Sequence, residues 1–264
     1  MTPLALEECD TIQALGFAQA TGGSTMLHAG TLIVLLITAT ELWVAADSHV
    51  VAIGARQTGA PALCKIYPFG PVFYAEAGLL KDTAGRFSAA AMAAQAAAEQ
   101  PTVPEAAGAF ARRALEPLVE AVHTLRALNP RYYEARVRGK AALQVAFFGV
   151  AGRGPQLAIR RFVIHEAGPG GLWAAVDRFD CPGDCAGPGT WAFLGGSEVL
   201  PAFLEAHPRY LPTHGARATL QRLMALEARA HPGEVTPPVD ILRIGPKGPA
   251  WVQRKSSCPP LPSP

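Results

Sequence analysis

The fold is decided by the stretch Ala29-Gly-Thr-Leu-Ile-Val-Leu-Leu-Ile-Thr-Ala-Thr-Glu-Leu-Trp-Val-Ala-Ala-Asp-Ser-His49. Within it, Leu32–Ile37 is an almost unbroken run of β-branched and leucine residues, which predicts a strand buried on both faces. A short polar segment then predicts a turn, and the apolar run Leu42–Ala46 predicts a second strand. The stretch therefore predicts a β-hairpin that begins after Thr31 and ends at Asp47.

Thr31 is a candidate nucleophile because it stands directly before the first strand and after a glycine, Gly30. A threonine hydroxyl is weakly nucleophilic without an adjacent base, and the residue's own α-amino group is one base that enzymes use. That amine exists only if the chain is cut between Gly30 and Thr31, and its ordinary pKa of about 8 leaves it partly neutral at neutral pH. The same chemistry needs a carboxylate that orients the site and a lysine that tunes it. Asp47 and Lys65 follow in that order.

Four short motifs resemble those of the proteasome-type N-terminal nucleophile (Ntn) hydrolases, in particular the bacterial proteasome-subunit-like threonine peptidases. They are Gly30-Thr31, Ala45-Ala-Asp-Ser48, Cys64-Lys-Ile-Tyr67 and Ala75-Glu-Ala-Gly78. The separation of Thr31 and Asp47 matches the family's spacing, and Lys65 lies slightly further along than is usual. The resemblance implies that Thr31 is the nucleophile, that Asp47 orients the freed amine and the lysine, and that Lys65 lowers the pKa of that amine.

The resemblance also implies an α+β fold, namely a four-layer αββα sandwich of two antiparallel sheets flanked by helices. The order of the chain favours the same class, because runs of strand-like segments are separated by pairs of helix-like segments. A leader is expected at residues 1–30, either as a propeptide or as an ordinary N-terminus that stays attached. One Ntn-hydrolase-like domain is expected at residues 31–253, and a flexible proline-rich tail at residues 254–264.

Gly78 and Ser197 are further candidates at the active site. Gly78 either offers its N–H to a developing oxyanion or simply ends a strand. Ser197 closes the turn Gly195-Gly-Ser197 before a predicted helix, where free N–H groups favour an anion or oxyanion. The resemblance implies that this serine supports the amine of the nucleophile, although it is displaced from the family position, and its alternative role is to cap the helix. Glu234 is the nearest match to the acidic residue that the family carries before its last strand.

Composition sets limits on the partners. Charged residues make up 17% of the chain and the formal net charge is +2. With no basic block, this balance argues against nucleic acid as a partner. No apolar run reaches the length of a membrane span, and residues 1–30 lack a signal-peptide pattern, so no membrane partner and a cytoplasmic location are expected.

The five cysteines are odd in number and irregularly spaced, which argues against a disulfide framework and favours a reducing compartment. Cys181 and Cys185 are spaced like half of a zinc site, but the sequence offers no matching second half. Two free thiols in a surface loop are therefore the preferred interpretation. No metal and no organic cofactor is expected.

The predicted function is an autoprocessed N-terminal threonine hydrolase of the proteasome-subunit type, which cleaves peptide or amide bonds after self-cleavage between Gly30 and Thr31. The resemblance implies a homo-oligomer, of which a ring is one form. Two alternatives stay open. In the first alternative, the chain is a non-catalytic member of the fold that keeps its leader and acts as a structural or binding subunit. In the second, it is an amidase that acts on small amides only. Retention of the leader favours the first alternative, and a panel of peptide and small-amide substrates identifies the second.

Overall fold

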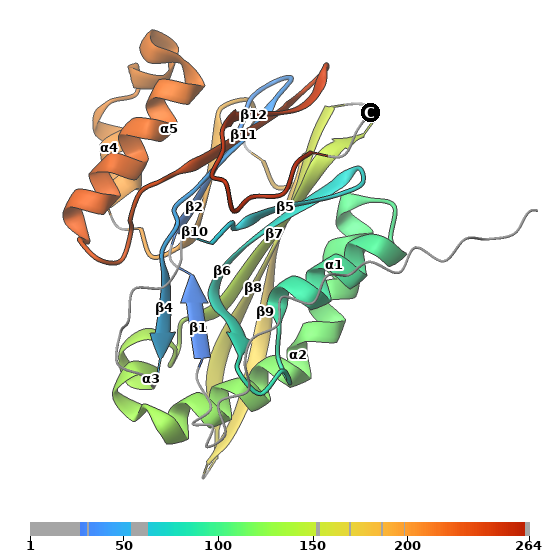
Figure 1. The fold of residues 1–264 in the computed structure, drawn as a ribbon, viewed down its shortest axis with the longest axis vertical. Coiled ribbons are helices and arrows are strands. Elements are labelled where there is room, and N and C mark those ends of the chain that lie inside the picture. Colours follow the sequence, from blue (N-terminus) through green and yellow to red (C-terminus); the bar gives the residue numbers. More distant parts are fainter. Residues whose placement is uncertain are drawn as a thin grey trace, which may run out of the picture.

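The computed structural model describes residues 27–30, 32–53, 63–151, 154–168, 170–185, 187–197 and 199–261. Over these residues the chain forms five α-helices and two antiparallel β-sheets, in agreement with the predicted α+β class (Figure 1). The predicted nucleophile, Thr31, and most of the predicted leader lie outside the described residues. None of the helices that the structure describes is long and apolar enough to span a membrane.

The larger sheet has seven strands in the described residues, in the order β4-β1-β6-β7-β8-β9, with β5 also paired to β6. They are β1 (Leu27–Gly30), β4 (Val50–Ile53), β5 (Ile66–Phe69), β6 (Val72–Asp82), β7 (Ala141–Ala151), β8 (Gly154–Ala167) and β9 (Gly171–Cys181). β1 belongs to the predicted leader. It is nevertheless an internal strand, paired antiparallel with β4 on one side and with β6 on the other.

The smaller sheet has five strands in the described residues, in the order β10-β2-β3-β11-β12. They are β2 (Leu32–Ile37), β3 (Leu42–Ala46), β10 (Thr190–Gly195), β11 (Asp240–Gly245) and β12 (Gly248–Gln253). β2 and β3 confirm the predicted hairpin, and across its turn the Thr38 N–H donates to the Glu41 carbonyl oxygen at 2.8 Å. Every residue of β2 is buried, as its unbroken apolar run predicts.

The described part of the chain forms five helices. They are α1 (Ala89–Glu99), α2 (Val103–Leu128), α3 (Pro130–Arg136), α4 (Val199–Ala206) and α5 (Tyr210–Ala230). Ser88 caps α1 by accepting a hydrogen bond from the Ala91 N–H at 3.2 Å. α2 has a proline in its first turn, where the missing N–H has no partner within the helix to lose.

Clusters of buried apolar side chains hold these elements together. The first packs α1 and α2 on the larger sheet and includes Phe110 against Phe147. The second joins the two sheets and includes Leu35 and Phe73. The third packs α4 and α5 on the smaller sheet and includes Leu32. Because alternate residues of β2 belong to the second and third clusters, this strand is covered on both faces.

The prediction of free cysteines is wrong for the residues that the structure describes. Cys64 and Cys258 form one disulfide, and Cys181 and Cys185 form another. The first pair was hidden because its members are 194 residues apart in the sequence and meet only in the folded chain. The disulfides also remove the argument from cysteine spacing for a reducing compartment.

Residues 254–261 differ from the flexible tail that their composition predicts. Lys255 and Cys258 in this segment are buried, with 5% and 2% of their surface exposed. The segment follows β12 and returns to Cys64, which precedes β5, and it appears in dark red near the C-terminus in Figure 1. The prolines of the segment indicate only a local preference for irregular backbone. Its position is fixed by contacts with residues far away in the sequence.

Candidate active site

The chain passes from one sheet to the other between Gly30 and Leu32. Gly30 ends β1 in the larger sheet, opposite Val50 of β4 and Gly78 of β6, and Leu32 begins β2 in the smaller sheet. Thr31 joins these two residues in the sequence and lies outside the described residues. The predicted cleavage site thus coincides with a crossing between the two sheets.

Asp47 lies directly beside this crossing. The register of the hairpin pairs Ala46 with Ile33, which brings the adjacent residues Asp47 and Leu32 together. The buried carboxylate of Asp47 accepts hydrogen bonds from the Leu32 N–H at 3.1 Å and from the His49 N–H at 2.9 Å. The Leu32 N–H belongs to the peptide bond that follows residue 31. The carboxylate therefore binds the backbone of the residue that follows the predicted nucleophile in the chain.

Lys65 forms an ion pair with Asp47, and the two side chains are 1% and 0% exposed. Burial lowers the pKa of Lys65, and the Asp47 carboxylate opposes that effect. A positive charge in this position favours the neutral form of a nearby amine, which is the form that a general base must have. The structure thus brings two of the predicted site residues together beside position 31.

A cavity of about 660 Å³ brings two other predicted residues together. Its lining includes Ala29 of β1, Gly78 of β6 and the Gly195–Ser197 turn. Asp47 and Lys65, by contrast, are almost fully buried. The predicted site residues therefore form two groups, a buried ion pair and part of a cavity wall, with β1 and the sheet crossing next to both.

Gly78 lies inside β6, which continues to Asp82, so the alternative that this glycine ends a strand is wrong. Its φ of +90° is a backbone conformation that favours glycine. An added Cβ atom would lie 2.3 Å from the carbonyl oxygen of Ala142 in β7. The backbone of β7 therefore excludes a side chain on one side of Gly78, while Gly30 pairs with it from the other strand.

Ser197 is joined to an acidic residue that the sequence analysis missed. Its hydroxyl donates to Glu227 of α5 at 3.3 Å, and the other oxygen of Glu227 lies 2.8 Å from His231 Nδ1. This order differs from a serine–histidine–acid triad, because the carboxylate separates the imidazole from the hydroxyl. Glu227 is 1% exposed and follows Met224 on the buried side of the helix. A carboxylate on an otherwise apolar stripe was the signal that could have revealed it.

Glu234 lines the same cavity but is a half-exposed residue that forms an ion pair with Arg136. The fully buried acid in this region is Asp240, the first residue of β11, which pairs with Lys255 at 2.7 Å. Lys255 also donates to the backbone oxygen of Asp47 at 3.2 Å. Neither member of this second buried pair was predicted from the sequence. The signal in the sequence that could have revealed the pair was Asp240, a charged residue at the start of an apolar strand.

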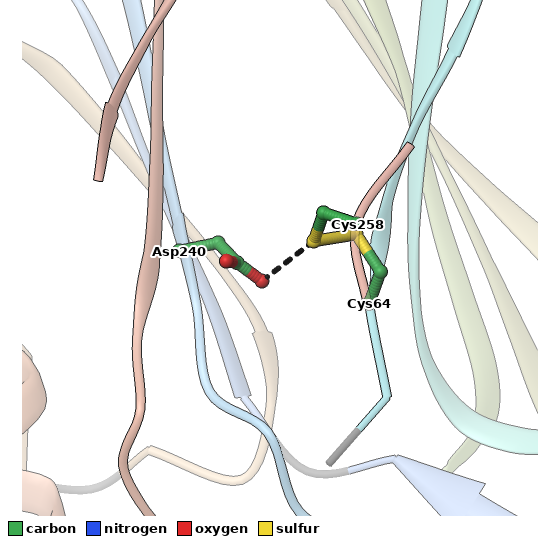
Figure 2. Close-up of side chains that lie close together, drawn as sticks. All are labelled: Cys64, Asp240 and Cys258. Carbon is green, nitrogen blue, oxygen red and sulfur yellow. Dashed lines mark hydrogen bonds between the residues drawn. A yellow bond between two sulfur atoms is a disulfide. The ribbon is translucent and has the colours of Figure 1, made fainter. Parts of the chain in front are cut away.

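One group of metal-ligating residue types lies close together in the described part of the chain, namely Cys64, Asp240 and Cys258 (Figure 2). Their ligand atoms lie within 4.8 Å of one another. The two sulfurs are joined in a disulfide, and the carboxylate pairs with Lys255. Because these donors are already engaged, the group links segments of the chain and does not form a metal centre in this state.

Glu76 of β6 is a further acid that the sequence analysis missed, and only 2% of its surface is exposed. Burial raises its pKa to about 8, and the charges of Lys65 and Lys81 limit the rise. Its Oε2 atom has no hydrogen-bond partner among the described residues. The carboxyl group is therefore mainly protonated at neutral pH.

Glu76→Gln is expected to flatten the dependence of stability on pH. Folding raises the pKa of Glu76 from 4.5 to about 8. The contribution of this group to the free energy of unfolding is therefore fully present below pH 4.5 and is lost as the pH rises to about 8. The loss amounts to about 1.4 kcal/mol per pH unit for such a group. Urea unfolding between pH 4.5 and 8.5 measures the effect, with the exposed Glu205→Gln as control. Parallel curves for the wild type and Glu76→Gln would show that this carboxyl is not perturbed.

No protein-family model matches this chain, and no curated protein matches it. The chemistry of the site therefore has to indicate the function. The chemical groups to be explained are a buried carboxylate–ammonium pair bound to the Leu32 N–H, and a separate cavity lined by Gly78 and Ser197.

Proposed function

We propose that this protein is an autoprocessed N-terminal threonine hydrolase of the proteasome-subunit type, which cleaves peptide bonds after self-cleavage between Gly30 and Thr31. The observation that carries the proposal is the Asp47 carboxylate, which binds both the Leu32 N–H and the Lys65 ammonium beside the sheet crossing. A buried ion pair adds little net stability, because desolvation offsets much of the attraction. A catalytic reason for this pair is therefore favoured over a purely structural one.

The proposal includes the four-layer αββα sandwich of the Ntn hydrolases. Support comes from the three apolar clusters, of which one lies between α1–α2 and the larger sheet, one between the two sheets, and one between the smaller sheet and α4–α5. This order of contacts is the one that four stacked layers would produce.

In the proposed self-cleavage, the Thr31 hydroxyl attacks the carbonyl carbon of Gly30, and the peptide nitrogen leaves as the α-amine of Thr31. The product is an ester, which water hydrolyses. This step releases the leader as a carboxylic acid and leaves Thr31 with a free amine and a free hydroxyl. Asp47 holds the backbone on the threonine side of the broken bond through the Leu32 N–H. The charge of Lys65 favours the neutral amine.

An extended peptide is the proposed substrate because removal of β1 would leave a strand-shaped gap between β4 and β6. β1 pairs through its backbone with β4 and β6, and its departure would leave those donors and acceptors to a peptide in the same position. A substrate carbonyl would then replace that of Gly30 opposite Gly78. The Thr31 hydroxyl would attack this carbonyl, its proton would pass through the amine to the leaving nitrogen, and water would hydrolyse the acyl ester.

The intact mass of purified wild type, Thr31→Ala and Thr31→Ser tests the proposal. We expect the wild type to lose residues 1–30, Thr31→Ala to stay full length, and Thr31→Ser to cleave because it retains a hydroxyl. Peptide hydrolysis by Thr31→Ala should fall by about 10³-fold or more, as for other lost nucleophiles. A full-length wild type that hydrolyses peptides, or a Thr31→Ala that loses its leader, would contradict the assigned role of Thr31.

A non-catalytic subunit of the same fold is the second candidate, and one observation favours it. β1 is paired on both sides within the larger sheet, so the retained leader completes that sheet. In this case the wild type and Thr31→Ala would both remain full length and would have the same thermal stability. Processing of the wild type alone would exclude this candidate.

Two finer parts of the proposal need their own measurements. Hydrolysis of extended peptides in preference to small amides is expected from the strand-shaped position of β1, and a substrate panel measures it. A homo-oligomer, with a ring as one form, is expected from the resemblance of the motifs, and light scattering of the purified protein measures the number of subunits.

A further inference from the structure

The segment Lys255–Cys258, here called the C-terminal clasp, is attached to the residues around the proposed active-site ion pair. Cys258 is joined by a disulfide to Cys64, which directly precedes Lys65 in the chain (Figure 2). Both cysteines are buried. Any displacement of Cys64 therefore acts directly on the backbone that carries Lys65.

Lys255 connects the clasp to the other half of the ion pair. Its Nζ donates to the backbone oxygens of Leu63 at 2.9 Å and of Asp47 at 3.2 Å, and it pairs with Asp240 at 2.7 Å. The backbone N–H of Lys255 donates to Asp240 as well, at 2.7 Å. One side chain thus links the loop that carries Asp47 to the segment that leads into Lys65. Asp240 in turn fixes the position of this side chain.

The surroundings of the two cysteines suit both oxidation states. Cys258 Sγ lies 3.0 Å from a carboxylate oxygen of Asp240, and Cys64 Sγ lies 3.1 Å from the carbonyl oxygen of Ile66. After reduction, each thiol would have an acceptor within reach, so no S–H group would be buried without a partner. Reduction would therefore leave no unsatisfied S–H group at this position, which favours a reversible change.

We propose that the Cys64–Cys258 disulfide is a redox switch that positions Lys65 and Asp47, an inference that rests on the proposed hydrolase function. A dithiol reductant supplies two electrons and two protons, the S–S bond breaks, two protein thiols form, and the reductant becomes a disulfide. The clasp then loses its covalent attachment to Cys64. The backbone at Lys65 gains freedom, and both self-cleavage and peptide hydrolysis slow. Lys255 is a positioning residue in this scheme.

The second disulfide provides a matched control. Cys181 and Cys185 are only four residues apart, at the end of β9 and in the loop that follows it. Their bond constrains this loop, whereas the bond of Cys258 connects the clasp to the residue before Lys65. The double variant Cys181→Ser/Cys185→Ser therefore removes a disulfide without releasing the clasp.

Self-cleavage rates of the full chain test the switch. We expect Cys64→Ser/Cys258→Ser to cleave about 10- to 100-fold more slowly than the wild type, as for small misplacements of catalytic groups. Cys181→Ser/Cys185→Ser should cleave at the wild-type rate. Wild type treated with dithiothreitol should slow and recover on reoxidation, and Lys255→Met should slow as well. If Cys64→Ser/Cys258→Ser does not fold, the rates of the reduced wild type and of Lys255→Met test the switch in its place.

The pH profile of peptide hydrolysis distinguishes positioning from general destabilisation. With the clasp released, Lys65 no longer lowers the pKa of the Thr31 amine fully, so the acid limb of the profile should move to higher pH. A uniform loss of rate at every pH would argue for destabilisation alone and against the proposal. Equal cleavage rates in Cys64→Ser/Cys258→Ser and the wild type, with the wild-type disulfide verified by the mass after alkylation, would overturn it.

Hydrogen exchange tests the clasp independently of activity. Amides of residues 32–49 and 63–67 should exchange faster in Cys64→Ser/Cys258→Ser and in reduced wild type than in Cys181→Ser/Cys185→Ser. If the wild type never cleaves itself in either redox state, the hydrolase proposal fails, and faster exchange in these segments would still support the clasp as a structural link. Unchanged exchange, or free Cys64 and Cys258 thiols in the untreated protein, would overturn the clasp.

Discussion

Lys65→Met is expected to stop self-cleavage and to lower the free energy of unfolding by about 3–5 kcal/mol, the usual effect of breaking a buried ion pair. The variant removes the ammonium and leaves the Asp47 carboxylate buried, with 0% of its side chain exposed. Methionine keeps an unbranched chain of similar length, so the cavity that it leaves is small. Urea unfolding measures the stability, and the intact mass measures the cleavage.

The double variant Asp47→Asn/Lys65→Met separates the catalytic effect from the structural one. With both charges gone, the desolvation penalty disappears together with the attraction, so most of the lost stability should return. The amide oxygen of the introduced asparagine can still accept a hydrogen bond from the Leu32 N–H. Self-cleavage should nevertheless stay absent. A stable double variant that removes its own leader would show that the pair is structural.

An exposed ion pair serves as the control for these variants. Arg138 pairs with Glu134 and Glu166, and its side chain is 52% exposed. Arg138→Met should change the free energy of unfolding by less than about 1 kcal/mol, because exposed pairs contribute little. Self-cleavage should be unaffected. An effect as large as that of Lys65→Met would mean that charge removal at any position, rather than burial of the pair, explains the result.

The part of the site that could be predicted is the part encoded by local pattern. The apolar run of β2 and the one that follows it fix the hairpin, and the hairpin register then places Asp47 beside Leu32. The resemblance of the Cys64-Lys-Ile-Tyr67 motif implied a role for Lys65 beside Asp47, and the structure pairs these two residues. These residues lie within one short region of the chain, where the order of strands and turns leaves few arrangements.

Pairing between distant segments could not be predicted in the same way. The strand β10 follows β7, β8 and β9 of the larger sheet in the chain, yet it pairs with β2 in the smaller sheet. A pattern of alternating or continuous apolar residues determines which faces are buried but not which strand becomes the neighbour. The same limit hid the disulfide of Cys64 and the contacts of Lys255, because their partners are far away in the sequence.

Gly78→Ala is expected to lower the free energy of unfolding by about 3–5 kcal/mol, which combines backbone strain with overpacking. The alanine would have to adopt a φ of +90°, and its Cβ would lie 2.3 Å from the Ala142 carbonyl oxygen. That oxygen belongs to the backbone of β7, so it cannot move away without disturbing the pairing of β6 with β7. Urea unfolding measures the loss.

Gly70→Ala is the matched control, because Gly70 also has a positive φ, of +57°, but an added Cβ would meet nothing within 4 Å. Its cost should be limited to the conformational strain of about 1–2 kcal/mol. The excess loss at Gly78 therefore reports mainly the close approach of β7, together with the different φ of the two glycines. Equal losses would mean that β7 yields easily at Gly78. A larger loss at Gly78 would show that β6 is held rigidly where it faces Gly30, which is the rigidity that a backbone N–H needs if it is to stabilise an oxyanion without moving.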